Sequence, residues 1–285
     1  MYGRLFYYLY RVKKLTRVSN MSNFKHHMLV QLSCFFLLIS CGASSDSPDV
    51  DTEIPPPSPP ANTLSDKSDD FTGDGALLGF VVNNENALTD VVRSAGRYRA
   101  NLTDNTNDIT LHFNDRQGRL DAKLLTFPFE FVARNIGIGT QADSQTAQSS
   151  SGNSYIFAGV QIHVEDLTSL NSSHIVVGHR GQTSFTLEGK NTVEGVSSVN
   201  DLGLNIVSTG RADIRVVGNA DRSINIYWQQ PELSVDAWQP YNGNARLPGD
   251  APVYGSQVYV GLITYAQGSE DIPFVGTCDA IEIYE

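Results

Sequence analysis

The stretch YIFAGVQIHV, from Tyr155 to Val164, decides the fold of this chain. It is rich in aromatic and β-branched residues and contains no proline, which is typical of a β-strand. Successive side chains of a strand face opposite ways, so its residues divide into two sets. The even positions are all apolar, whereas the odd positions include Gln161 and His163. The stretch therefore predicts a strand that is buried on one side and amphipathic on the other.

The same alternation recurs through the C-terminal part of the chain, and clusters of Gly, Asn, Asp and Pro separate the runs. One segment alone, ENALTDVVRSAG (85–96), has a helical pattern. Many short strands without regular helices predict an all-β fold, an antiparallel β-sandwich of two sheets over residues 71–285. The other predicted strands are DITLHFND, FPFEFVARNI, SHIVVGHRG, TSFTLEGK, ADIRVVG, SINIYWQQ, QVYVGLITYA and CDAIEIYE.

The N-terminal segment differs sharply from the rest. It has six Lys or Arg residues and no Asp or Glu before position 28, followed by the apolar run MLVQLSCFFLLIS, Met28 to Ser40. This run is too short to span a hydrocarbon core of about 30 Å. Residues 1–40 are therefore predicted to be a signal peptide, and Met21 or Met28 would give a more ordinary signal length than Met1.

The apolar run ends in LISCG, Leu38 to Gly42, which resembles the signal of bacterial lipoproteins. The resemblance implies that Cys41 becomes the acylated N-terminus, and Gly42 in the next position resembles sorting to the outer membrane. The alternative is that Cys41 is an ordinary residue beside a conventional cleavage site. We expect an exported protein, lipid-anchored to a bacterial outer membrane and facing the periplasm or the cell surface. It would touch the membrane through the lipid anchor only.

Residues 41–70 have the composition of a linker. They are rich in Ser, Asp and Pro and nearly free of large apolar residues, so they predict a disordered, extended tether. Loss of residues 1–40 removes six positive charges and no negative charge, which changes the formal net charge from −11 to −17. This charge argues against nucleic acid as a partner. Without Cys34 and Cys41, Cys278 has no intramolecular disulfide partner and is predicted to be buried.

Five segments together resemble the concanavalin A-like lectin/glucanase superfamily. The resemblance implies a jelly roll whose first and last strands pair and whose one sheet is concave. The superfamily includes sugar-binding modules, glycosidases and polysaccharide lyases, so the fold does not choose the function. The segments are DDF (69–71), FAGVQIHVED (157–166), INIYWQQPELSVDAW (224–238), VYVGL (258–262) and FVGTCDAIEIY (274–284).

The triplet Gln161-Ile162-His163 resembles one found in jelly-roll alginate lyases. There, glutamine helps to neutralise the substrate carboxylate and histidine accepts the neighbouring proton. β-Elimination from a uronate needs a neutraliser, a base and an acid for the leaving oxygen. We expect Arg215 to assist Gln161 and Tyr227 to be the acid, if the protein is a lyase. The alternatives are Arg134 or Arg180 as neutralisers and Tyr259 or Tyr265 as acids.

A glycosidase is a poorer interpretation of the sequence. Retaining enzymes of the superfamily need two carboxylates about 5 Å apart, usually alternating along one strand. No such string occurs, and the glutamates that could be considered are predicted to lie on the solvated surface. These are Glu188, Glu194, Glu282 and Glu285.

Glycan binding requires only aromatic platforms and polar groups beside them. The segment YWQQPELSVDAWQPY offers Trp238 and Tyr241 as platforms, with Gln239 and Asn242 as hydrogen-bonding neighbours. Trp238 packed back on the sheet edge is the alternative, and Trp228 is predicted to lie in the core because it is in phase with Ile224 and Ile226.

Calcium is the one cofactor that the sequence suggests, as a structural ion at Asp70 and Asp279 where the first and last strands would pair. The histidines lack zinc spacing. Two functions therefore remain open. One is a cell-envelope lipoprotein with a carbohydrate-binding or interaction β-sandwich, and the other is a polysaccharide lyase. Which outward faces line a groove cannot be decided by periodicity alone.

Overall fold

A computed structural model describes residues 63–73, 79–85, 90–101, 118–139, 155–180, 185–200, 207, 209–231, 237–267 and 275–285. All of these belong to one compact unit, Pro55–Glu285. The signal segment with Cys41, the tether up to residue 62 and the predicted strand DITLHFND lie outside the described residues. Within the described residues, no helix is long and apolar enough to cross a membrane.

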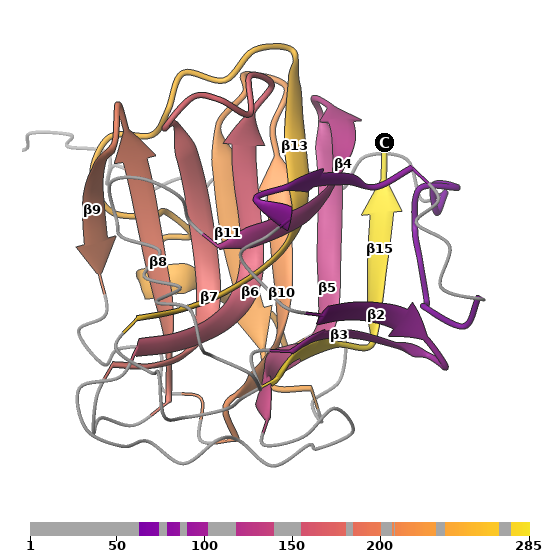
Figure 1. The fold of residues 1–285 in the computed structure, drawn as a ribbon. Coiled ribbons are helices and arrows are strands. Elements are labelled where there is room, and N and C mark those ends of the chain that lie inside the picture. The colour runs from indigo at the N-terminus through magenta and orange to yellow at the C-terminus, as the bar shows by residue number, and fades with distance from the viewer. Residues whose placement is uncertain are drawn as a thin grey trace, which may run out of the picture. The chain divides into compact units, whose positions relative to one another are not determined.

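The quoted stretch forms strand β6 (Tyr155–Val164), with the bounds predicted from its composition. It lies inside an antiparallel seven-stranded sheet, with β13 on one side and β7 on the other. Figure 1 shows β6, β7, β8 and β9 side by side. The order of this sheet is β1 (Val81–Asn83), β4 (Arg119–Thr126), β13 (Gln257–Gln267), β6, β7 (Ser172–Arg180), β8 (Thr186–Val193) and β9 (Val196–Asn200).

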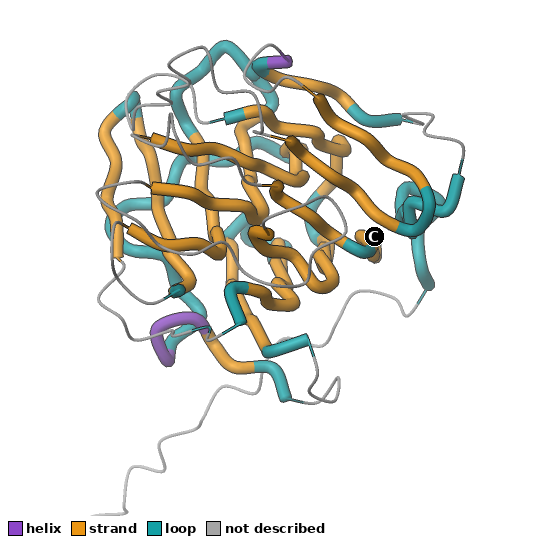
Figure 2. The backbone as a smooth tube through the Cα atoms, turned by 60° about the horizontal axis from the view of Figure 1, so that its bottom comes forward, coloured by secondary structure: helices purple, strands orange, loops and turns teal. Residues whose placement is uncertain are grey.

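The second layer is an antiparallel eight-stranded sheet in which β15 (Ala280–Tyr284) pairs with β5. Figure 2 shows the strands of the two sheets stacked as layers. A one-turn 3-10 helix, η2 (Tyr241–Gly243), follows the edge strand β12 of this sheet. The order of the sheet is β12 (Gln239–Pro240), β11 (Ile224–Gln229), β10 (Arg211–Gly218), β5 (Phe129–Gly139), β14 (Val275–Cys278), β3 (Arg97–Asn101) and β2 (Asp90–Ser94).

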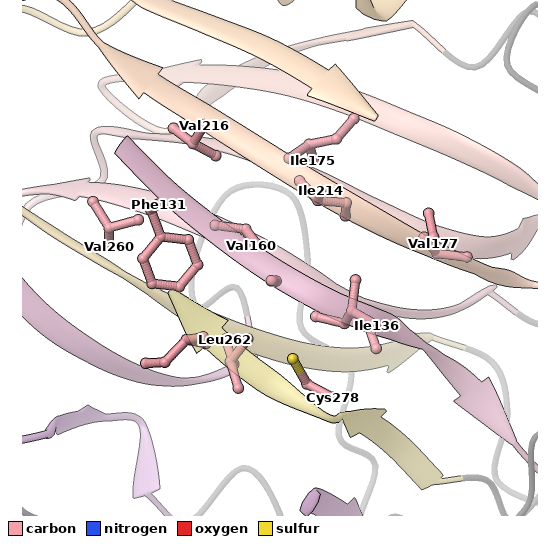
Figure 3. Close-up of a cluster of buried hydrophobic side chains, with 14 of the residues drawn as sticks. Phe131, Ile136, Val160, Ile175, Val177, Ile214, Val216, Val260, Leu262 and Cys278 are labelled. Atoms are coloured by element: carbon pink, nitrogen blue, oxygen red, sulfur yellow. The ribbon is translucent and has the colours of Figure 1, made fainter. Parts of the chain in front are cut away.

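The core lies between the two sheets and includes the inward side chains that the alternation predicted. Ile156, Val160 and Ile162 of β6 belong to one buried cluster with residues of the opposite sheet such as Phe131 and Ile214. Figure 3 shows Val160 with Phe131 and Ile214 in this cluster. Each fully buried side chain of this kind contributes about 1.5–3 kcal/mol of apolar transfer free energy. Trp228 and Cys278 also lie in this core, as predicted. The antiparallel β-sandwich expected from the sequence is confirmed.

Two boundaries differ from the expectation. Residues 90–94 of the segment with the helical pattern form strand β2, because pairing with β3 outweighs a weak local preference. Residues 63–70, assigned to the linker, pair with the last strand, since Leu64 bridges Tyr284 and Asp69 bridges Ile281. The packed domain therefore begins by residue 63, and the first and last described segments pair as the resemblance implied.

Candidate functional site

The outer face of the seven-stranded sheet, turned away from the core, carries a row of polar side chains. Gln161 on β6 lies opposite His174 on β7, and His174 lies opposite Lys190 on β8. Directly opposed residues of an antiparallel pair have Cβ atoms about 4.5–5.5 Å apart. The register therefore places an amide, an imidazole and an ammonium group side by side across three strands.

His174 is held against Tyr265 of β13. Their rings stack with centroids 5.6 Å apart and an interplanar angle of 24°, and the Tyr265 hydroxyl is 3.4 Å from His174 Nε2. Tyr265 also packs on Phe157, at 5.2 Å between ring centroids, and Lys190 Nζ is 6.0 Å from the centre of the Tyr265 ring. Packing thus fixes a phenol and an imidazole next to each other.

A second row contains His163, which lies opposite Tyr259 of β13 and Ser172 of β7. Gln161 Nε2 donates a hydrogen bond to Ser172 Oγ at 3.1 Å, which ties the two rows together. His163 Nδ1 is 2.8 Å from the carbonyl oxygen of Val164, and because a carbonyl oxygen only accepts, Nδ1–H donates this hydrogen bond. Burial lowers the pKa of His163 and outweighs the opposing effect of the nearby backbone carbonyls. The ring is therefore neutral at neutral pH.

The polar side chains of this face are buried, although the face does not contact the other sheet. The relative exposure is 0% for His174, 1% for Glu188, 2% for Lys190 and 3% for Gln161. Outer faces of antiparallel sheets are normally solvated, and Lys and Glu are rarely fully buried. Ionisable side chains buried together on an outer sheet face make this region a candidate functional site. We call Gln161, His174, Glu188, Lys190 and Tyr265 the β6-face site.

The four residues expected to act in a lyase do not share one site. Gln161 and His163 lie on the outer face of the seven-stranded sheet. Arg215 and Tyr227 lie on the outer face of the eight-stranded sheet, because their neighbours Ile214 and Ile226 point into the core. Arg215 Nη2 donates to Glu130 at 2.7 Å there.

The other residues considered for these roles divide in the same way. Arg134 lies on the outer face of the eight-stranded sheet, where it pairs with Glu282. Arg180 belongs to β7, but its side chain is outside the described residues. Tyr259 and Tyr265, the alternative acids, share the face of Gln161.

The glycan-binding residues expected from the sequence are also separated. Tyr241 is 0% exposed, and its hydroxyl accepts a hydrogen bond from the Gly189 amide at 2.7 Å, so this tyrosine belongs to the core and is not a surface platform. Trp238 is partly exposed and Gln239 is exposed. Asn242 is partly exposed within η2, in a left-handed conformation with φ of 52°.

The carboxylates considered for calcium have other partners. Asp70 Oδ1 accepts hydrogen bonds from the amide and hydroxyl groups of Thr72. Asp279 forms an ion pair with Arg97 at 2.7 Å and accepts a hydrogen bond from Asn135. Among the described residues, no group of three or more His, Cys, Asp or Glu side chains is arranged to hold a metal ion. Asp70 thus stabilises a turn through Thr72, and Asp279 connects neighbouring strands through Arg97 and Asn135.

Three residues of the β6-face site were not identified from the sequence. Glu188 was expected on the solvated surface but is buried. No role was predicted for His174 or Lys190, which belong to the predicted strands SHIVVGHRG and TSFTLEGK. The alternation indicates correctly that all three point away from the core, but only the register of β7 and β8 brings them to Gln161.

A pocket of about 210 Å³ lies elsewhere, under the segment 246–251. Two of its polar lining residues, Ser173 and Asn191, bond to each other and to nearby residues. Ser173 Oγ donates to Asn191 and accepts from Tyr254, and Asn191 Nδ2 donates to the carbonyl oxygen of Pro248 at 3.1 Å. This arrangement fastens the segment to the sheet.

Comparison with known proteins gives structural matches only. Neither a scan of protein-family models nor a search of curated protein sequences gives a match. A xylan β-1,4-xylosidase from Bacillus halodurans C-125 aligns with a TM-score of 0.53 and 14% identity over 81% of this chain. This chain spans 41% of the length of that xylosidase.

Two further structures align more weakly. A Bacillus licheniformis β-glucanase has a TM-score of 0.40 and 12% identity over 76% of this chain and 97% of its own. An alginate lyase from Alteromonas sp. 272 has a TM-score of 0.38 and 15% identity over 72% of this chain and 93% of its own. The xylosidase match, at a TM-score of 0.53 and 14% identity, shows a shared type of fold and nothing finer, so the function must be argued from the site.

Proposed function

We propose that this protein is a cell-envelope lipoprotein whose β-sandwich binds polysaccharide at the β6-face site. The observation that carries the proposal is the joint burial of Gln161, His174, Glu188 and Lys190 beside Tyr265 on an outer sheet face. Amide, imidazole and ammonium groups can bind sugar hydroxyls and carboxylates, a carboxylate can accept from sugar hydroxyls, and the packed rings of Tyr265 and Phe157 form the apolar side of the site. The fold type shared with glycan-acting proteins is compatible with this role.

The test is a binding screen of the mature chain, from residue 41 onward, against polysaccharides immobilised on an array. We expect at least one glycan to bind, and Lys190→Met or Gln161→Leu to weaken that binding about tenfold or more, since each removes a hydrogen bond from a desolvated site. Lys67→Met is the matched control, because Lys67 pairs with Glu285 near the last strand. Equal losses in Lys190→Met and Lys67→Met would contradict the placement of the site.

A polysaccharide lyase is the second candidate, favoured by the two histidine–tyrosine pairs that flank Gln161. His163 lies opposite Tyr259, and His174 contacts Tyr265. In β-elimination the Gln161 amide would bind the uronate carboxylate and a histidine would take the neighbouring C–H proton. The electron pair of that bond would form the C=C bond as the glycosidic C–O bond breaks, and a tyrosine O–H would protonate the leaving oxygen.

Absorbance of the unsaturated product, followed on a panel of uronate polymers, separates the two candidates. If the protein is a lyase, two double variants identify the histidine–tyrosine pair that acts. They are His163→Asn with Tyr259→Phe, and His174→Asn with Tyr265→Phe. The variant that lacks the catalytic pair should form no product while its polysaccharide binding is unchanged. Binding without product on every polymer would eliminate the lyase and leave the binding function.

Attachment to the membrane through Cys41 is the remaining part of the proposal. It is supported by the basic segment, the apolar run and the LISCG sequence that follows it. Metabolic labelling with an alkyne analogue of palmitate should label the natural chain and not Cys41→Ser, and the variant should leave the outer-membrane fraction. An unlabelled natural chain would contradict the lipid anchor without affecting the binding proposal.

A further inference from the structure

The outer face of the eight-stranded sheet carries an aromatic ring over two guanidinium groups. β12 pairs with β11 through Tyr227 and Pro240 and through Trp228 and Gln239, so Trp238 follows beside Gln229. The Trp238 ring lies over the guanidinium carbons of Arg134 and Arg215, at 5.7 and 5.9 Å from its centre. Arg215 also lies 5.5 Å from the centre of the Tyr227 ring. We call Trp238, Tyr227, Gln229, Arg134 and Arg215 the Trp238 patch.

The cations of this patch are already matched by carboxylates. Arg134 donates to Glu282 through Nε and Nη2, both at 2.8 Å, and through Nη1 to Asp213 at 3.1 Å. Arg215 pairs with Glu130 at 2.7 Å. Three carboxylates against two guanidinium groups leave the patch without positive charge to attract an anion. Its electrostatics therefore favour an uncharged ligand over a uronate.

Two polar atoms of the patch lack a hydrogen-bond partner among the described residues. Gln229 is 1% exposed, and its Nε2 donates to Asp213 at 3.0 Å, but its Oε1 accepts no hydrogen bond. Arg215 Nε is likewise buried and donates none. A buried polar atom without a partner is unfavourable, and a ligand that supplies the missing hydrogen bond removes that cost. One atom is an acceptor and the other a donor, and a sugar hydroxyl can serve both.

We propose that the Trp238 patch is a second glycan-binding site, which takes a neutral sugar residue. The Trp238 indole turns outward from the two arginines and stacks on the sugar ring, while sugar hydroxyls donate to Gln229 Oε1 and accept from Arg215 Nε. A bound sugar would then satisfy the two atoms that have no hydrogen-bond partner among the described residues. This site lies across the core from the β6-face site, so it goes beyond the proposed function and does not depend on it.

Tryptophan emission offers a direct test, because the chain has two tryptophans and Trp228 is in the core. In Trp228→Phe, the emission of Trp238 is followed during titration with hexasaccharides of β-1,4-glucan, β-1,4-xylan, β-1,3-glucan and β-1,4-mannan, and with uronate hexasaccharides. We expect a saturable change with at least one neutral oligosaccharide. Gln229→Leu should weaken it about tenfold, whereas Lys190→Met and the matched exchange Gln257→Leu on the other sheet should not.

Calorimetric titration of the chain with both tryptophans, compared with Trp238→Ala, replaces the emission test if Trp228→Phe does not fold. The proposal is overturned if no neutral oligosaccharide binds, if Gln229→Leu binds as tightly as the unaltered site, or if a uronate hexasaccharide binds there more tightly than every neutral one. If Lys190→Met loses polysaccharide binding but keeps the Trp238 emission change, the β6-face site and the Trp238 patch bind independently.

Discussion

His163 shows how burial sets the chemistry of a single side chain. Its outward direction was predictable, because it alternates with Ile162 of the core. Its neutral state was not, because the lowered pKa results chiefly from desolvation, which depends on residues distant in sequence. The same limit explains Glu188 and Tyr241, whose burial depends on neighbouring strands and on the hydroxyl contact with Gly189. Alternation along a strand predicts which way a side chain points, whereas the solvent exposure of that side chain depends on tertiary contacts.

A pH dependence of stability follows from the lowered pKa of His163. As pH falls through about 6.5, the unfolded chain protonates this histidine more readily than the folded chain does. Stability should therefore decrease below about pH 6.5 until the lowered folded pKa is reached. In His163→Asn, urea unfolding midpoints should fall less between about pH 7 and about pH 5 than in the natural chain. An equal fall in both proteins, or an NMR titration of His163 without a lowered pKa, would contradict this.

At the scale of elements, β4 was not identified from the sequence because its inner face is charged. Asp121 and Lys123 oppose Leu262 and Val260 of β13, which point into the core. The Tyr98 hydroxyl of the other sheet donates to Asp121 at 2.8 Å, and Arg119 pairs with the same carboxylate at 3.0 Å. A strand whose inward positions are Asp and Lys does not show the apolar alternation by which strands such as β6 are recognised.

Close contact between β6 and β7 depends on Gly159. A Cβ atom at this position would lie 2.2 Å from the carbonyl oxygen of Ile175, so the backbone of β7 would have to shift. Gly159→Ala should reduce the free energy of unfolding by about 1–3 kcal/mol, the usual cost of overpacking. Gly255→Ala is the control, because its nearest contacts are an ordinary 3.8–4.0 Å. Equal urea midpoints for the two variants would contradict this account.

For the whole molecule, the alternation predicted the sandwich but not the distribution of residues between the sheets, and the pairing of the two ends was implied by the family resemblance alone. Each run shows which side chains point outward, whereas membership of a sheet depends on pairing partners far along the chain. Arg215 and Gln161 illustrate this, since both point outward and yet lie on opposite outer faces. The catalytic residues predicted for a lyase were chosen because they point outward, and they therefore came from both outer faces of the sandwich.

The domain boundary leads to a prediction for the whole domain. Residues 63–70 hold β15 through backbone hydrogen bonds, including Ser65 to Ile283 at 2.7 Å and Ile281 to Asp69 at 2.8 Å. Lys67 adds an ion pair with Glu285 at 2.6 Å. Without this segment β15 loses pairing on the side away from β5.

A chain beginning at residue 71 should thus be less stable than one beginning at residue 63 by about 2–4 kcal/mol, since each lost backbone hydrogen bond contributes about 0.5–1.5 kcal/mol. Urea unfolding of the two chains measures the difference, and the exposed edge of β15 should also make the shorter chain more prone to aggregate. If both chains unfold at the same urea concentration, residues 63–70 act as a linker, as their composition alone suggested.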